Sequence, residues 1–223
     1  MSDGIAKYLS SSVGKKYLMS LTGLAWSLFV LTHMLGNLLI FAGPEAYNKY
    51  SHALVSNPLI YVAEAGLLGL ILVHIYNAFS LKFRNWRAKP QLYAVRPKGP
   101  KGASLSSSTM IYTGSIILVF LISHLITFKY GQHYAINYGG VEMRDIHRLV
   151  MEIFQNPAYV AWYLVCLVFV GVHLYHGVAS SFQTLGINHP RFNGGIKVFG
   201  YAYSIIVAAG FISQPLYVLI ATR

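Results

Sequence analysis

Four of the nine histidines stand where ionisable side chains are rare, inside long uncharged or nearly uncharged segments. His33, His74, His124 and His173 lie in four consecutive apolar stretches, one in each. An ionisable side chain at membrane depth is costly and usually marks a function or a paired interior site. For a single histidine an interhelical hydrogen bond is an equally good explanation. One histidine in each of four successive stretches indicates a shared site.

The depth of each histidine within its stretch sorts the four into two layers. At 1.5 Å per residue, His33 and His124 lie toward one membrane face and His74 and His173 toward the other, about 12 Å away. Two imidazoles that face each other across a four-helix bundle are the axial ligands of a low-spin b-type haem. Zinc would need three or four ligands in one cluster. The pattern therefore predicts two stacked b haems. Depth alone does not choose between His173 and His176 as the partner of His74.

The elements that must position these histidines are long apolar helices. A membrane crossing needs about 20 apolar residues, and because backbone groups in hydrocarbon must be paired internally, such runs are helical. We expect an all-α integral membrane protein with five transmembrane helices, the first four forming a bundle around the haems and the fifth peripheral. The single domain covers 1–223, with helices at about 18–42, 58–81, 109–128, 158–182 and 198–222.

Composition supports this fold class and excludes others. Of the 223 residues, 55% are hydrophobic and 10% are charged, against about 25% charged in an ordinary soluble domain. The mean hydropathy is +0.51. These values exclude a soluble globule, a disordered chain and a nucleic-acid-binding arm. The single cysteine, Cys166, lies in an apolar stretch, so no disulfide framework is expected.

The basic residues predict the orientation. Twelve Lys and Arg residues precede the first stretch or lie in the segments after the second and fourth, and five lie on the other side. By the positive-inside rule the N-terminus is cytoplasmic and the C-terminus external. No cleaved signal or Arg- and Ser-rich transit segment is expected, which favours a bacterial cytoplasmic (inner) membrane.

Two segments outside the stretches are also informative. The cytoplasmic loop 82–108 carries seven basic residues, no acid and many Pro, Gly and Ser residues, so we expect it to be irregular. It is either a solvated positive loop or a docking surface for a protein subunit or anionic membrane lipid. The external segment 143–156 has helical apolar spacing and is expected to be a short amphipathic helix at the interface.

Several segments resemble one known family. They are VHLYHGVASSFQTLGI (172–187), GPEAYNKYSH (43–52), HIYNAFSLKFRNWRAKP (74–90) and MIYTGSIILVFLISH (110–124). In order and in histidine spacing the chain resembles the single-chain dihaem cytochrome b anchor of succinate:quinone oxidoreductases and quinol:fumarate reductases, over almost its whole length.

The resemblance implies a set of ligands and partners. It favours His173 over His176, with His33 and His124 on a distal haem and His74 and His173 on a proximal one. It implies cytoplasmic partners, a flavoprotein with covalent FAD and an iron–sulfur subunit, the latter facing the basic loop. Electrons would pass between the iron–sulfur clusters, two haem b and a quinone, with menaquinone favoured. Dicarboxylate chemistry would lie on the flavoprotein, and no catalytic residue is assigned here. The direction of the reaction, the quinone species and a dimer of heterotrimers stay open.

Further residues are candidates for supporting roles. Around the haem propionates we consider His176, Lys15, Lys16 and Ser20, although the lysines are also typical positive-inside anchors. For quinone and proton exchange the candidates are Glu45, His52, Glu64, Glu142, Asp145, His147 and Arg148. For each of them taken singly, Glu64 excepted, a solvated loop residue is the better explanation. Glu64, the one carboxyl within a stretch, is either neutral in the bundle or part of a proton path.

Three other functions fit the sequence less well. Another dihaem carrier, of the cytochrome b561 type, also has four consecutive histidine-bearing helices, but the basic loop, the fourth-helix motif and the fifth helix argue against it. A non-redox transporter with a histidine proton relay would need more carboxylates than Glu64 beside the histidines, and it would be colourless. A purely structural anchor is disfavoured by the intact histidine pairs.

Overall fold

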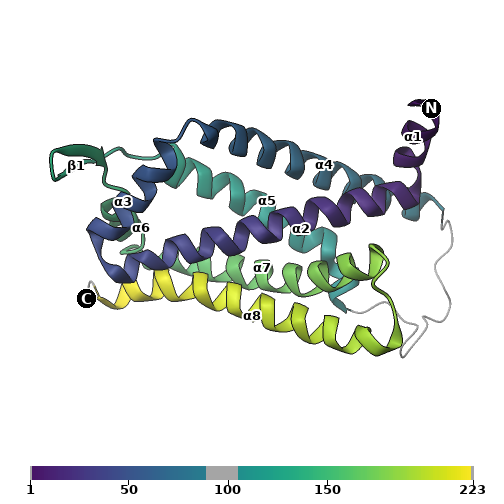
Figure 1. Ribbon diagram of the computed structural model, residues 1–223. Coiled ribbons are helices and arrows are strands. Elements are labelled where there is room, and N and C mark those ends of the chain that lie inside the picture. The colour runs from purple at the N-terminus through teal and green to yellow at the C-terminus, as the bar shows by residue number, and fades with distance from the viewer. Residues whose placement is uncertain (1, 89–104, 222–223) are drawn as a thin grey trace.

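The described residues form five long helices, which lie side by side along the molecule (Figure 1). The computed structural model describes residues 2–88 and 105–221. The long helices are α2 (Ser12–Asn37, continued by the 3-10 turn η1, Leu38–Ala42), α4 (Leu59–Arg87), α5 (Leu105–His124, continued by the π-helical turn η3, Leu125–Lys129), α7 (Pro157–Thr184) and α8 (Pro190–Ala221). All five are long and apolar enough to cross a membrane. The predicted all-α, multi-pass membrane character is thus confirmed.

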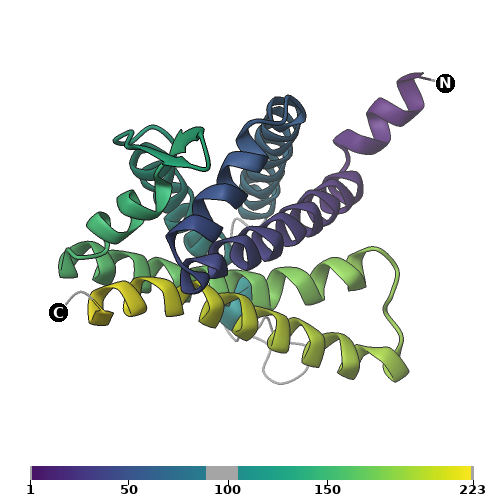
Figure 2. The same ribbon diagram turned by 60° about the vertical axis from the view of Figure 1, so that its left-hand side comes forward.

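The helices are ordered so that two pairs face each other diagonally. Around the bundle α2 packs against α4 and α7, and α5 packs against α7 and, more sparsely, α4. In this order α2 is opposite α5, and α4 is opposite α7. Helix α8 packs mainly on α7 and also on α2, and it lies along one edge of the molecule in two views (Figures 1 and 2).

The helices extend beyond the apolar runs that predict them. Helix α2 begins at Ser12, where the Ser11 side chain accepts a hydrogen bond from the Gly14 N–H (3.0 Å). Helix α4 continues to Arg87, and α5 begins at Leu105, so the expected loop 82–108 is helical at both ends. Its middle, 89–104, lies outside the described residues. Lys and Arg are good helix formers, so a helix need not end where its apolar stretch does.

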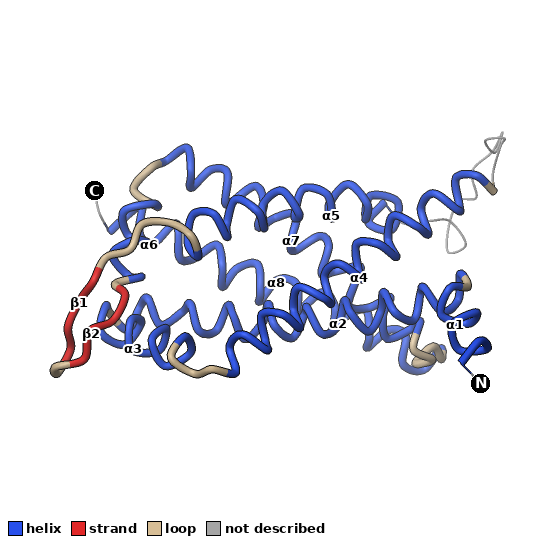
Figure 3. Tube along the Cα trace, turned by 90° about the horizontal axis from the view of Figure 1, so that it is seen from above, coloured by secondary structure: helices blue, strands red, loops and turns tan. Residues whose placement is uncertain are grey.

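One end of the bundle is covered by a small cap made of α3 (Pro44–Val55), the hairpin β1 (Ala135–Tyr138) and β2 (Val141–Arg144), and α6 (Ile146–Ile153). Figure 3 shows the hairpin at this end and α1 (Ser2–Ser10) at the opposite end. The expectation of one amphipathic helix over 143–156 is therefore wrong in part. Its beginning is a strand, because Gly139 and Gly140 both adopt positive φ (61° and 86°) and close a two-residue hairpin turn.

The buried side chain of Asn48 holds the parts of the cap together. Asn48 of α3 is fully buried; its amide donates to Asp145 Oδ1 (2.8 Å) and its carbonyl oxygen accepts from the His147 N–H (2.9 Å). Asp145 also accepts from the Arg148 N–H (3.0 Å) and thereby caps α6. These bonds join α3 to α6 across almost one hundred residues of chain.

Candidate functional site

The histidines of the apolar stretches form two pairs across the two diagonals of the bundle. The rings of His33 (α2) and His124 (α5) have centroids 5.9 Å apart. The rings of His74 (α4) and His173 (α7) have centroids 6.4 Å apart. We call the first the hairpin-end pair, because it lies nearer the cap, and the second the N-terminal-end pair. Both pairings are those that depth in the sequence predicts.

Both pairs have the donor chemistry and spacing of bis-imidazole haem ligation. An iron atom about 2 Å from one nitrogen of each of two opposed rings puts their centroids about 6 Å apart. Within residues 2–88 and 105–221 no three His, Cys, Asp or Glu side chains gather as a metal cluster. Two imidazoles without a carboxylate or thiolate suit haem iron better than tetrahedral zinc. The residues therefore fit a haem at each pair.

The two pairs are well separated along the membrane-spanning helices. Along α2, His33 comes 11 residues after Thr22, whose hydroxyl contacts His74. Eleven residues of helix span about 16 Å. The pairs thus form distinct layers, at a spacing somewhat larger than the sequence predicts, because that prediction took each helix midpoint from its apolar run alone.

The imidazoles of the N-terminal-end pair are each held by a threonine. Thr22 Oγ1 lies 3.2 Å from His74 Nδ1, and Thr113 Oγ1 lies 3.0 Å from His173 Nδ1. His173, and not His176, has the ring that faces His74; His176 lies about one turn further along α7 and is half-buried. Of the two alternatives that depth leaves open, His173 is the one whose ring lies opposite His74 in the structure.

The hairpin-end pair has a different, largely aromatic surrounding. His124 Nδ1 lies 3.0 Å from the Tyr163 hydroxyl, and Phe128 of the following π-helical turn lies against the same imidazole, with ring centroids 5.3 Å apart. Single π-helical turns are frequent at functional sites. On the opposite side the Asn37 amide donates to the His33 carbonyl (2.8 Å) and lies 3.4 Å from its ring nitrogen Nδ1.

Asn37 connects this layer to the cap. The Tyr47 hydroxyl of α3 donates to Asn37 Oδ1 over 2.6 Å. Tyr47 is buried, and burial together with the nearby Tyr50 raises its pKa, so the phenol stays protonated and remains a donor. Its ring also faces the imidazole of His147, with centroids 6.2 Å apart. A chain of contacts thus leads from His33 through Asn37 and Tyr47 to His147.

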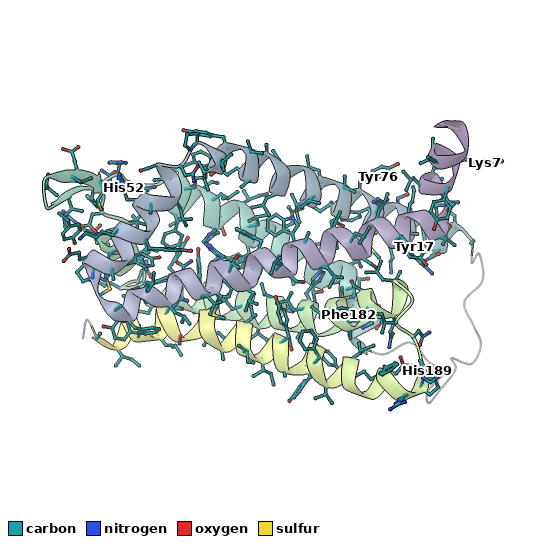
Figure 4. The ribbon with its side chains drawn as sticks, in the orientation of Figure 1. Lys7, Tyr17, His52, Tyr76, Phe182 and His189 are labelled. Atoms are coloured by element: carbon teal, nitrogen blue, oxygen red, sulfur yellow. The ribbon has the colours of Figure 1, made fainter. Side chains whose placement is uncertain are left out.

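The residues expected near the haem propionates lie at the N-terminal end of the bundle. Lys15 is buried, donates to the Ser80 hydroxyl of α4, and has its Nζ 5.0 Å from the centroid of the Tyr76 ring. Tyr76 is labelled at this end in Figure 4. Ser20 is buried two residues before Thr22, whereas Lys16 is exposed. Lys15 and Ser20 are therefore interior residues on the side of the His74–His173 pair.

Glu64 does not stand alone in its helix. It forms an ion pair with Lys129, the last residue of the π-helical turn, and both side chains are about 40% exposed. Glu64 precedes His74 by ten residues, or about 15 Å of helix, which puts it near the level of the hairpin-end pair. The ion pair joins α4 to η3, the continuation of α5, and α4 and α5 are the two neighbours of the bundle that touch most sparsely.

The remaining proton-exchange candidates lie in the cap. Glu45 pairs with Lys49 (2.6 Å), and His52, labelled in Figure 4, has its Nε2 3.2 Å from the Ser56 hydroxyl. Glu142 is exposed, and Asp145 is used as the cap of α6. Of this set the structure connects His147 to the hairpin-end pair, through the contact chain given above.

Arg148 belongs to a surface cluster. Its guanidinium lies 2.9 Å from Glu152 and 4.0 Å from the centroid of the Tyr134 ring. Tyr134 donates to the same carboxylate (2.6 Å). These two donors hold the pKa of Glu152 below its usual range. For His147, partial burial lowers the pKa, and the negative charge of Asp145 partly opposes that effect.

Five side chains at the site escape the sequence analysis: Thr22, Asn37, Thr113, Lys129 and Tyr163. Thr and Tyr in an apolar helix usually satisfy their hydroxyls locally or at a helix contact, so type alone does not single them out. Comparisons of this chain with protein-family models, curated proteins and solved structures found no match. The function proposed next therefore depends on the arrangement of side chains and on the sequence patterns.

Proposed function

We propose that this chain is a dihaem b-type cytochrome that carries electrons across a membrane. The observation that carries the proposal is the presence of two histidine pairs on opposite diagonals of one helix bundle, with ring centroids 5.9 and 6.4 Å apart. When bound, two haems would supply one-electron redox chemistry in two layers of the membrane. Bis-imidazole ligation leaves no open position, which suits electron transfer better than oxygen chemistry.

The chain's own residues prepare both sites for ligation. A histidine ligand is oriented by the hydrogen bond that its other ring nitrogen makes. Thr22, Thr113 and Tyr163 each contact the Nδ1 of a different histidine, which leaves Nε2 as the nitrogen available to iron. The apolar helices around the pairs exclude water and favour a neutral imidazole.

More specifically, we propose the membrane-anchor role in a succinate:quinone oxidoreductase or quinol:fumarate reductase. The sequence resemblance and the basic N-terminal end, with Lys15, Lys16, Arg84 and Arg87, support it. In a bacterial inner membrane this end would face the cytoplasm and an iron–sulfur subunit, with a flavoprotein beyond it. Attraction between the basic residues and an acidic face of that subunit would orient the complex.

For the quinone we propose a site beside Glu64 and Lys129. The ion pair lies near the level of the hairpin-end pair, between two helices that touch sparsely. A carboxyl group at this place can exchange a proton with a quinol or a quinone, and the Lys129 side chain lies against it and positions it. The cap residues Glu45, His52, His147 and Arg148 lie on the outward side, where a proton would leave or enter.

Haem content tests the proposal. We expect the purified full chain in detergent to contain two b haems, as pyridine haemochrome. His33→Ala and His74→Ala should each lower the content to one, and reduced-minus-oxidised spectra should show that different haems are lost. His189→Ala is a matched control, because His189 lies beyond the spans, just before α8 (Figure 4). A folded wild-type chain without haem would overturn the proposal and favour a histidine-bearing transporter.

A further inference from the structure

We infer that two Thr-Gly dipeptides, Thr22-Gly23 in α2 and Thr113-Gly114 in α5, form a matched pair of cradles that orient the imidazoles of the N-terminal-end pair for metal ligation. This inference rests on the proposed haem ligation and adds four positioning residues to it. Each cradle lies on the helix next to the one that carries the histidine. Thr22-Gly23 holds His74 of α4, and Thr113-Gly114 holds His173 of α7.

The hydroxyl geometry favours one tautomer of each imidazole. Thr22 Oγ1 donates its single proton to the Leu18 carbonyl (2.7 Å), and Thr113 Oγ1 donates to the Met110 carbonyl (3.1 Å). With that proton used, the hydroxyl presents lone pairs to the ring nitrogen 3.0 to 3.2 Å away, an arrangement that favours the tautomer with the proton on Nδ1. The free lone pair then lies on Nε2, the nitrogen that ligates.

The glycines let the ring lie directly against the helix backbone. A methyl group added at Gly23 would be 3.3 Å from Cε1 of His74, and one at Gly114 would be 3.4 Å from Cε1 of His173. By contrast, methyl groups at Gly66 and Gly69 of α4 would meet nothing within 4 Å. A side chain at Gly23 would press on the His74 ring and one at Gly114 would just touch the His173 ring. The glycines thus leave room for each ring, while the neighbouring threonine sets its rotation.

The two cradles share one sequence pattern, Thr-Gly followed by nine residues and a histidine. It occurs as Thr22-Gly23 with His33 and as Thr113-Gly114 with His124. Eleven residues make three helical turns within about 20°, so the threonine and the histidine lie on one face of the helix. Helices α2 and α5 therefore have the same double role: each contributes a histidine to one layer and holds a histidine of the other.

Valine substitutions test the hydroxyls at constant side-chain shape. In Thr22→Val and Thr113→Val we expect haem affinity at the N-terminal-end layer to fall by about 10- to 100-fold. Loss of the acceptor also weakens the imidazole as a donor to ferric iron, so the midpoint potential of that haem should rise. If the affinity for ferric haem falls ten times more than the affinity for ferrous haem, the midpoint potential rises by about 59 mV. Thr22→Ser and Thr113→Ser, which keep the hydroxyl, should restore both values.

Controls separate this inference from a general loss of structure. Thr32→Val is the matched control, because Thr32 of α2 makes the same carbonyl bonds (2.9 and 3.3 Å) on an exposed face. Gly23→Ala and Gly114→Ala should shift the low-spin electron paramagnetic resonance signal of the same haem, and Gly66→Ala should not. A two-haem wild type whose Val and Ala variants keep both potentials and signals would refute the cradles alone. A haem-free wild type would refute the proposed function itself and the cradles with it.

Discussion

The two histidine layers, each proposed to hold a haem, consist of the same residue type but are supported by different parts of the molecule. At the N-terminal end, two hydroxyls within the spans hold the imidazoles, and neither depends on a segment outside the bundle. At the hairpin end, His124 is held by Tyr163, while His33 neighbours Asn37, which Tyr47 of the cap fixes in turn. One layer is therefore built into the helices, and the other is partly controlled by a peripheral subdomain. Because hydrogen bonds to the ligand tune a metal site, the layers should differ in potential and in response to mutation.

The largest effect should come from separating the cap from the bundle at Asn48. Asn48→Ala removes two hydrogen bonds and leaves the partly buried His147 N–H without its partner, which should cost about 2 kcal/mol of unfolding free energy. The denaturant midpoint followed by circular dichroism should fall. The haem at the hairpin-end pair should lose its native spectrum before the other haem does. Asn57→Ala, at an exposed asparagine of the turn after α3, should change the denaturant midpoint and the haem spectrum much less. Equal disturbance of the two layers would contradict their separate support.

The bundle was the more predictable region and the cap the less predictable one, for physical reasons. Helices such as α5 and α7 are required by long uncharged runs in a solvent that cannot pair backbone groups. The pairing of His33 with His124 then follows from helix direction and residue depth. The cap obeys no such rule, because its four-residue strands and eight-residue α6 are stabilised by contacts such as Asn48 with Asp145, distant in sequence.

The sequence did not reveal the two threonines that hold His74 and His173, for a different reason. Thr22 and Thr113 each bond a carbonyl of their own helix, as does the exposed Thr32, so their local sequence signal is the same. Only the position of His74 and His173 on neighbouring helices distinguishes them. The spacing from Thr-Gly to His is readable in the sequence, but its meaning depends on knowing that the threonine contacts the opposite layer.

A smaller and more local effect is expected at Tyr163. Tyr163→Phe keeps the ring that packs on Phe120 and Phe154 (centroids 4.8 and 5.0 Å away) but removes the hydroxyl at His124 Nδ1. We expect a loss of about 1 kcal/mol in stability and a shifted midpoint potential for the haem at the hairpin-end pair alone. Tyr203→Phe is the control, because the Tyr203 hydroxyl of α8 donates to the Ser27 carbonyl of α2, and it should leave both potentials unchanged. A shift at the N-terminal-end haem in Tyr163→Phe would mean that the layers are coupled.

The smallest effect should be a pH dependence confined to the cap. Burial lowers the pKa of folded His147 below its ordinary 6.5, and the negative charge of Asp145 partly opposes this shift. The aromatic neighbour of His147 is the Tyr47 ring. When the pH falls below 6.5, the unfolded chain binds a proton that the folded cap still resists, so the free energy of unfolding decreases until the pH reaches the lower folded pKa. Above 6.5 this contribution is constant.

Hydrogen exchange in α3 and α6 between pH 7.5 and 5.5 measures this effect, after correction for the intrinsic exchange rate. We expect protection to weaken toward the lower pH in the wild type and in His189→Gln, and to stay nearly level in His147→Gln. The threonine hydroxyls at the N-terminal-end pair do not titrate in this range, so the haem bound there should keep its spectrum throughout. Since Tyr47 connects His147 to Asn37, acidification should instead alter the hairpin-end haem. A pH response of equal size at both haems, or one that persists in His147→Gln, would show that the cap does not control its layer through this histidine.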